Sequence, residues 1–174
     1  MVNRTNRSYR SYNSRRSQFG IAVIEEPIRP RGAAIKMLQA GDTAEAAFIT
    51  TDRDMASSLS VSEEDSFPDV FATSRMIALM ELAGARLMRR ILEPQQLSVG
   101  VGVCIKHLAA TPNDTQVSAV ATFLEMEGKL FKFRVEAFDP AGKIGEGEHT
   151  RAVIDADRLI NGAKKRMAGV VSGQ

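Results

Sequence analysis

The stretch SRMIALMELAGARLMRRIL, residues 74–92, constrains the fold of this chain more than any other segment. Its apolar residues recur at helical spacing and cover most of the circumference, so the predicted helix has to be buried on several sides. Thr73 or Ser74 can cap its start by accepting a free backbone N–H. Glu93-Pro94 ends it, because proline disfavours helical geometry in the preceding residue. Such a helix is roughly 28 Å long, enough to cross a small domain.

Segments with strand character lie on both sides of the predicted helix. Before it, a strand is predicted over residues 44–51 and a short second strand over 57–60. After it, four longer strands are predicted over 97–110, 116–127, 129–139 and 143–154. Gly128 and the turn Asp139-Pro140-Ala141-Gly142 connect the last three as an antiparallel meander. A terminal helix is predicted over 155–167.

This order of elements predicts one α+β domain over residues 37–168. A helix that is apolar on most sides must be covered by the sheet, so the sheet has to curl around it. The expected result is a hot-dog fold, in which a curved antiparallel sheet wraps one long central helix, with a C-terminal helix added. Long strands leave an edge that favours pairing with another chain, so we expect a homodimer with continuous sheets, or a dimer of dimers.

The N-terminal residues differ in composition from the rest of the chain. Residues 1–20 carry five arginines and no acidic residue, with Ser and Asn between them. Three interpretations stay open: a disordered arm with Met37 as an alternative initiator, an organelle transit peptide, or a nucleic-acid-binding arm. We expect residues 1–36 to form a disordered basic extension and 169–174 a flexible tail, and we do not expect a nucleic-acid partner.

Composition narrows the classes of protein and site. Cys104 is the single cysteine and the net charge is +2. An intrachain disulfide is therefore impossible, and one cysteine with two histidines cannot form a zinc cluster within one chain. No ligand spacing supports a carboxylate-rich metal site, and no apolar run approaches the ~18 residues that span a bilayer. We expect a cytoplasmic protein without a metal and without a membrane partner.

The predicted helix carries one acidic residue, Glu81, on the side opposite its arginines. Its neighbours on the helical wheel include Gly84 and Ala85, which leave space beside the carboxylate. A carboxylate that points into an apolar interior is a candidate acid, base or nucleophile. The alternative is that Glu81 reaches the helix surface or binds a backbone donor.

Further candidates lie on the predicted strands. Alternation along 97–110 places His107 on the same face as Val99, either as a satisfied core histidine or as a partner of Glu81 within or across subunits. Gly100 indicates a bend of the sheet, or a backbone N–H that can stabilise an oxyanion.

The remaining side chains of the strands suggest less chemistry. Cys104 lies on the opposite face from His107 and is interpreted as packing. His149 and Arg151 share a face of the last strand. Arg151 can hold a phosphate or carboxylate, or be a solvated charge.

Three stretches together resemble the fluoroacetyl-CoA thioesterase family of hot-dog proteins. They are FPDVFATSRMIALMELAGARLM, LEPQQLSVGVGVCIKHLAATP and GEGEHTRAVI, and the similarity covers about residues 40–165. The resemblance implies hydrolysis of a short-chain acyl-CoA, or a similar acyl thioester, to a carboxylate and a free thiol. Coenzyme A is then part of the substrate, and no other cofactor is implied.

The resemblance also implies the site residues. Thr73, Glu81 and His107 match the catalytic residues of the family. Gly100, Arg151 and Phe67 match residues that bind the substrate, Phe67 as one of two lid phenylalanines. Glu81 would attack the thioester carbonyl or activate water, while His107 transfers protons and the Gly100 N–H with Thr73 stabilises the developing charge.

Two departures qualify this picture. The second lid phenylalanine is here Glu64, which favours a short acyl group other than fluoroacetyl. Eight helical residues separate Thr73 from Glu81 by ~12 Å, so they meet only if Thr73 lies outside the regular helix or if the site forms across a dimer interface.

Two other functions are weighed against hydrolysis. The first is a non-catalytic acyl-CoA-binding sensor, with the basic arm touching nucleic acid. The second is hydration of an enoyl thioester, which requires an Asp/His pair in a context that this sequence lacks.

Overall fold

The computed structural model describes residues 37–171, so the predictions for 1–36 and 172–174 lie outside the described residues. The strands are β1 (Thr43–Ile49), β2 (Gln96–His107), β3 (Gln116–Glu127), β4 (Leu130–Asp139) and β5 (Gly142–Asp155). The α-helices are α1 (Thr73–Met88) and α2 (Ala156–Val171), and two short 3-10 helices, η1 (Asp52–Asp54) and η2 (Ala56–Leu59), precede α1. No helix of residues 37–171 is long and apolar enough to cross a membrane.

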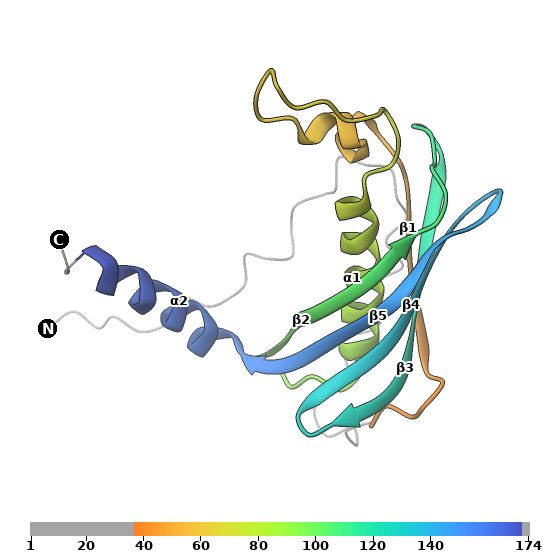
Figure 1. The fold of residues 1–174 in the computed structure, drawn as a ribbon. Coiled ribbons are helices and arrows are strands. Elements are labelled where there is room, and N and C mark those ends of the chain that lie inside the picture. The colour runs from red at the N-terminus through yellow and green to blue at the C-terminus, as the bar shows by residue number, and fades with distance from the viewer. Residues whose placement is uncertain (1–36, 172–174) are drawn as a thin grey trace, which may run out of the picture. The chain divides into compact units, whose positions relative to one another are not determined.

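The five strands form one antiparallel sheet in the order β1-β3-β4-β5-β2. The sheet curves around α1, which lies along its inner face (Figure 1). β1 and β2 are therefore the two edges, and β2 is the longer of them. This arrangement confirms the predicted α+β class and the curved sheet around one central helix.

The core lies between α1 and the inner face of the sheet. The helix contributes Met76, Leu79, Met80, Ala83, Leu87 and Met88, all at most 2% exposed. On β3 and β4 the facing residues include three alanines, Ala119, Ala121 and Ala137, each 0% exposed. Small side chains there let α1 approach the sheet closely, and each large apolar side chain buried against it contributes about 1.5–3 kcal/mol.

The predicted bounds of α1 were wrong at both ends. Ala72 occupies the N-cap position without a side-chain hydrogen bond, and Thr73 is already helical. The Thr73 hydroxyl instead contacts His107. At the other end α1 stops at Met88, and Ile91 N–H bonds the Met88 carbonyl oxygen in a tighter turn. A proline at 94 thus marks the end of the connection rather than of the helix.

The short strand predicted over 57–60 was also wrong. Residues Ala56–Leu59 form η2, and the Ser58 hydroxyl donates to the Met55 carbonyl oxygen at 2.7 Å. A serine that bonds its own neighbouring backbone offers the chain an alternative to a strand ladder. Beyond the predicted end of the terminal helix, α2 continues to Val171, so residues 169–171 of the predicted tail are helical.

β2 contains an irregularity that reverses its side-chain alternation. Gly100 pairs with Arg151 and Gly102 pairs with Thr150, so Val101 has no partner on β5. One extra residue in a strand exchanges the faces of everything beyond it. Val99 and His107 consequently lie on opposite faces, and their predicted common face was wrong.

Asp54 fixes the start of α1 to the segment before it. Its carboxylate accepts bonds from Arg75 Nε at 2.7 Å and from the Thr51 N–H and hydroxyl, both at 2.9 Å. Its carbonyl oxygen accepts the Ala72 N–H. Burial opposes ionisation of Asp54, but the Thr51 bonds and the Arg75 charge outweigh it, so the pKa of Asp54 lies below its usual value.

We expect Asp54→Asn to lower the free energy of unfolding by about 1–2 kcal/mol at neutral pH. A carboxyl with a depressed pKa in the folded state stabilises above its unfolded pKa, and this contribution disappears as pH falls through the folded value. The difference from wild type should therefore be complete at pH 7 and shrink below the usual pKa of 3.8. Urea unfolding at pH 7 and near pH 3 measures it. Asp69→Asn, at an exposed carboxylate, is the control, and an equal deficit at both pH values would contradict the assignment.

Candidate active site

Five of the six predicted site residues come from three elements and fall into two groups, and the sixth, Phe67, lies in a loop. α1 supplies Thr73 at its first residue and Glu81 two turns later, whereas β2 supplies Gly100 and His107. β5 supplies Arg151. We call the first group the Thr73–His107 pair and the second the Glu81 cluster, which consists of Glu81, Gly100, His149 and Arg151.

The Thr73–His107 pair is joined by a hydrogen bond of 2.8 Å between Oγ1 and Nδ1. This bond fixes the orientation of the imidazole. The other ring nitrogen, Nε2, is buried and has no hydrogen-bond partner among the described residues. A buried polar atom without a partner is uncommon in native proteins, and here it leaves one nitrogen available for proton transfer.

Glu81 lies against Gly100 at the β2 edge. A Cβ atom at Gly100 would lie 2.1 Å from Glu81 Oε1, so the carboxylate occupies the space that a side chain would fill. The glycine therefore marks both a bulge of the sheet and a close approach to the backbone. The side chain of Glu81 is 44% exposed, so its predicted burial was wrong. The sheet of one chain covers α1 on one side only, and Glu81 emerges where that cover ends.

Arg151 is a buried cation rather than a solvated one. It is 5% exposed, and it donates to the Ser98 hydroxyl at 3.1 Å and the Ser98 carbonyl at 2.8 Å. A further donor atom, Nη1, lies 3.3 Å from the Glu81 carbonyl oxygen. Burial lowers the pKa of Arg151, and the charge of Glu81 counteracts this. The guanidinium thus ties β5 to both β2 and α1.

His149 belongs to the Glu81 cluster, although the sequence pointed only to its neighbour. It is 1% exposed, and its Nδ1 lies 2.9 Å from the Gly102 carbonyl oxygen. A carbonyl only accepts, so Nδ1 carries the proton and Nε2 accepts from Arg151 Nη1 at 2.9 Å. Burial lowers the pKa of His149, and the Arg151 charge adds to this effect against the Gly102 bond and the Glu81 charge. The signal available in the sequence was the shared strand face of residues 149 and 151.

Phe67 lies in neither group. It is 47% exposed in the loop between η2 and α1, and no hydrogen bond or ring contact joins it to the described residues of either group. Glu64, at the second lid position, is exposed in the same loop. The structure thus leaves the predicted lid open.

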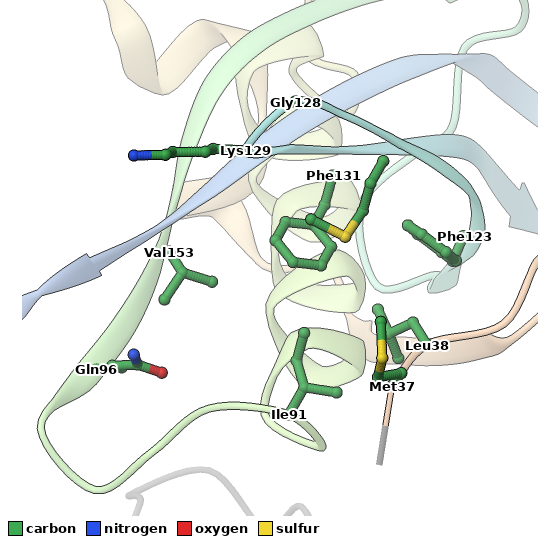
Figure 2. Close-up of a pocket in the computed structure, with 10 residues that line it drawn as sticks. Met37, Leu38, Ile91, Gln96, Phe123, Gly128, Lys129, Phe131 and Val153 are labelled. Carbon is green, nitrogen blue, oxygen red and sulfur yellow. The ribbon is translucent and has the colours of Figure 1, made fainter. Parts of the chain in front are cut away.

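A pocket of about 610 Å³ lies away from the predicted residues, beyond the C-terminal end of α1. Figure 2 shows its apolar lining, to which Ile91, Phe131 and Val153 contribute, with Lys129 also at the pocket. None of the predicted catalytic residues lines it.

The match of this chain to known proteins decides its family. A sequence model of fluoroacetyl-CoA-specific thioesterases matches residues 51–157. The chain belongs to this family. The fluoroacetyl-CoA thioesterase of Streptantibioticus cattleyicolor is 44% identical over 93 residues, which cover 53% of this chain and 67% of that protein.

Solved structures agree with this membership. A variant of the fluoroacetyl-CoA-specific thioesterase in complex with fluoroacetate and CoA is 35% identical, with a TM-score of 0.66 over 70% of this chain and 99% of that one. A hot-dog-like protein from Thermanaerovibrio acidaminovorans, 20% identical, covers 73% of this chain and 91% of its own with a TM-score of 0.64. The predicted hot-dog fold and acyl-CoA thioesterase activity are thereby confirmed, and the non-catalytic sensor is not favoured.

Substitutions of Gly100 and Gly102 test whether catalysis by this thioesterase requires the Glu81 carboxylate to lie against Gly100. In Gly100→Ala the new methyl group would meet Glu81 Oε1 at 2.1 Å and His149 Cε1 at 3.0 Å. The flexible carboxylate can move away, so we expect an almost unchanged melting temperature and a loss of kcat of about 100-fold, as misplaced catalytic groups produce.

Gly102→Ala is the matched control on the same bulge. Its methyl group would lie 3.8 Å from the nearest atom, Thr150 Cβ, which is an ordinary contact. Thiol-release rates and thermal melts of both variants decide the matter. Equal kcat values for the two variants would show that catalysis does not depend on the position of the Glu81 carboxylate.

Proposed function

We propose that this thioesterase hydrolyses a short-chain acyl-CoA, with Thr73, Glu81 and His107 as catalytic residues. Gly100, Arg151 and Phe67 bind the substrate in this proposal. The observation that carries the proposal is the place of the Glu81 carboxylate. It lies against Gly100, which has no side chain, and beside the buried cation Arg151, yet it remains open to solvent. A substrate carbonyl can reach such a group.

Two routes satisfy this geometry. Glu81 attacks the thioester carbon, forming an acyl-glutamyl anhydride that water then hydrolyses, or it removes a proton from a water molecule that attacks directly. In the direct route the oxygen of water enters the product carboxylate, and in the anhydride route it does so when water attacks the acyl carbonyl, which returns Glu81 as a carboxylate. In both routes the CoA sulfur leaves and takes up a proton. His107 Nε2 is the group that delivers this proton, while the Gly100 N–H and Thr73 stabilise the oxyanion.

The lid determines the acyl group in this proposal. A charged Glu64 and a half-exposed Phe67 do not form a dry aromatic cover. A substrate whose selection depends on excluding water is therefore disfavoured, and we propose a short acyl group other than fluoroacetyl. The reaction uses no cofactor beyond the CoA part of the substrate. A cytoplasmic location fits the free thiol of Cys104.

A homodimer completes the site in this proposal. β2 is an edge strand with exposed apolar residues, namely Leu97 at 48%, Val101 at 54% and Val103 at 46%. Antiparallel pairing of two β2 strands around an axis near Val103 would place the partner subunit's His107 beside Gly100. The Thr73–His107 pair of one chain would then serve the Glu81 cluster of the other.

The catalytic assignment of Glu81 is tested by Glu81→Gln, which keeps the shape of the side chain and removes its charge. Loss of a catalytic base or nucleophile should lower kcat by about 10²–10⁴-fold. Thiol release over a panel of acetyl-, propionyl-, butyryl- and fluoroacetyl-CoA measures it. Glu93→Gln, at an exposed acid outside the site, is the matched control, and EDTA should leave the wild-type rate unchanged. If wild type and Glu81→Gln are equally active on every substrate, Glu81 is not catalytic.

The shared site is tested by combining two inactive variants in one dimer. Glu81→Ala and His107→Ala carry different affinity tags and are co-expressed, so that the heterodimer can be purified. By symmetry the heterodimer has one site with both changes and one intact site, so it should regain about half of the wild-type rate per dimer. Light scattering measures the mass of the purified protein and so checks that it is a dimer. An inactive heterodimer would mean that Glu81 and His107 act within one chain.

A further inference from the structure

We propose that His149 is a positioning residue: its neutral imidazole holds Arg151 and the bulge of β2 in place while leaving the charge of Arg151 uncancelled. The inference rests on the proposed function of the Glu81 cluster and explains how that cluster is organised. His149 acts through Arg151 and Gly100 and takes no part in bond making.

The acceptors around Arg151 among residues 37–171 are all neutral. Its four hydrogen bonds go to the Ser98 hydroxyl, the Ser98 carbonyl, the Glu81 carbonyl and His149 Nε2. No carboxylate among residues 37–171 forms a salt bridge with it. A buried arginine usually has an anionic partner. Here the positive charge stays available to the nearest acid, Glu81, and to an oxyanion that forms beside it.

The two ring nitrogens of His149 have different and complementary tasks. Nδ1–H donates to the Gly102 carbonyl at 2.9 Å, at the point where β2 bulges. The lone pair of Nε2 accepts from Arg151 at 2.9 Å. Glu81 Oε1 lies 3.8 Å from the same nitrogen and receives no proton from it. Glu81 therefore lies close to a cation without a direct ion pair, and its lone pairs stay free to attack.

Two glycines admit the ring to this position. A Cβ atom at Gly84 on α1 would lie 3.4 Å from His149 Cδ2, and one at Gly100 on β2 would lie 3.0 Å from Cε1. The imidazole thus fills the space between α1, β2 and β5. Because one ring contacts all three elements, a change at residue 149 shifts Arg151 and the Gly100 backbone together.

The charge of the acceptor at 149 is therefore the decisive property. A neutral acceptor holds Arg151 and leaves its field intact. A carboxylate would hold Arg151 as an ion pair, but it would cancel the field at Glu81, and without a donor it would leave the Gly102 carbonyl unpaired. An apolar side chain would leave a buried donor and the Gly102 carbonyl unpaired, which costs stability as well.

The experiment compares His149→Gln with His149→Glu, two side chains of the same shape. Gln is neutral and can donate to the Gly102 carbonyl as well as accept from Arg151, whereas Glu is an anion that only accepts. Gln should retain kcat within about 10-fold of wild type, whereas Glu should lower kcat by about 100-fold or more, in the range that lost electrostatic stabilisation produces. KM for the best acyl-CoA of the panel should change less than kcat. Thermal melts should show that the His149→Glu variant is folded, since its side chain retains an acceptor for Arg151.

Equal kcat values for folded Gln and Glu variants would overturn the inference, and so would an effect confined to KM. If His149→Glu does not fold, His149→Leu replaces it, and Gln must then exceed Leu in kcat at a temperature where both are folded. The outcomes separate the two proposals. A wild-type protein without thiol release from any acyl-CoA overturns the proposed function, whereas an active wild type with equal Gln and Glu variants overturns the role of His149 alone.

Discussion

One extra residue in β2 makes the arrangement of the candidate active site possible. Gly100 and His107 are seven positions apart, and in a regular strand an odd separation places two residues on opposite faces. The bulge at Val101 reverses the alternation, so both residues face α1. Without it, either the carboxylate of Glu81 would lose its place on Gly100 or the imidazole of His107 would turn away from Thr73. The bonds of His149 and Arg151 to Gly102 and Ser98 hold the strand on both sides of this bulge.

The sequence was sufficient for the architecture but not for several local details. Helical periodicity, Gly128 and the Asp139–Gly142 turn place α1 and the meander correctly, because these signals are local. The start of α1 was missed because the Thr73 hydroxyl bonds a residue 34 positions away instead of capping its own helix. The strand predicted over 57–60 failed for the opposite reason, since Ser58 bonds the backbone beside it. The periodicity of apolar residues contains no information on these two side-chain hydrogen bonds.

The candidate site shows the same limit. A wheel places Glu81 opposite the arginines, yet it cannot tell how far the sheet extends over that side, and 44% of the side chain is exposed. Strand alternation pairs His149 with Arg151, but their importance depends on which β2 atoms they meet. The register between β2 and β5 shifts by one residue at the bulge, so that Arg151 pairs with Gly100 whereas His149 pairs with Val103. A long-range register cannot be read from one strand, which is why the sequence predicted no role for His149.

The separation of the two groups also has a structural consequence. Thr73 and Glu81 are both in regular helix, eight residues or ~12 Å apart, and a helix cannot bend to bring them together. The same edge of the sheet exposes Glu81 and the valines of β2, so the half-open carboxylate and the uncovered apolar strand lie on one surface. A second copy of this chain on that edge would bury the valines and supply the missing imidazole in one step. Catalysis and assembly would then depend on the same strand, and the bulge in β2 would determine both.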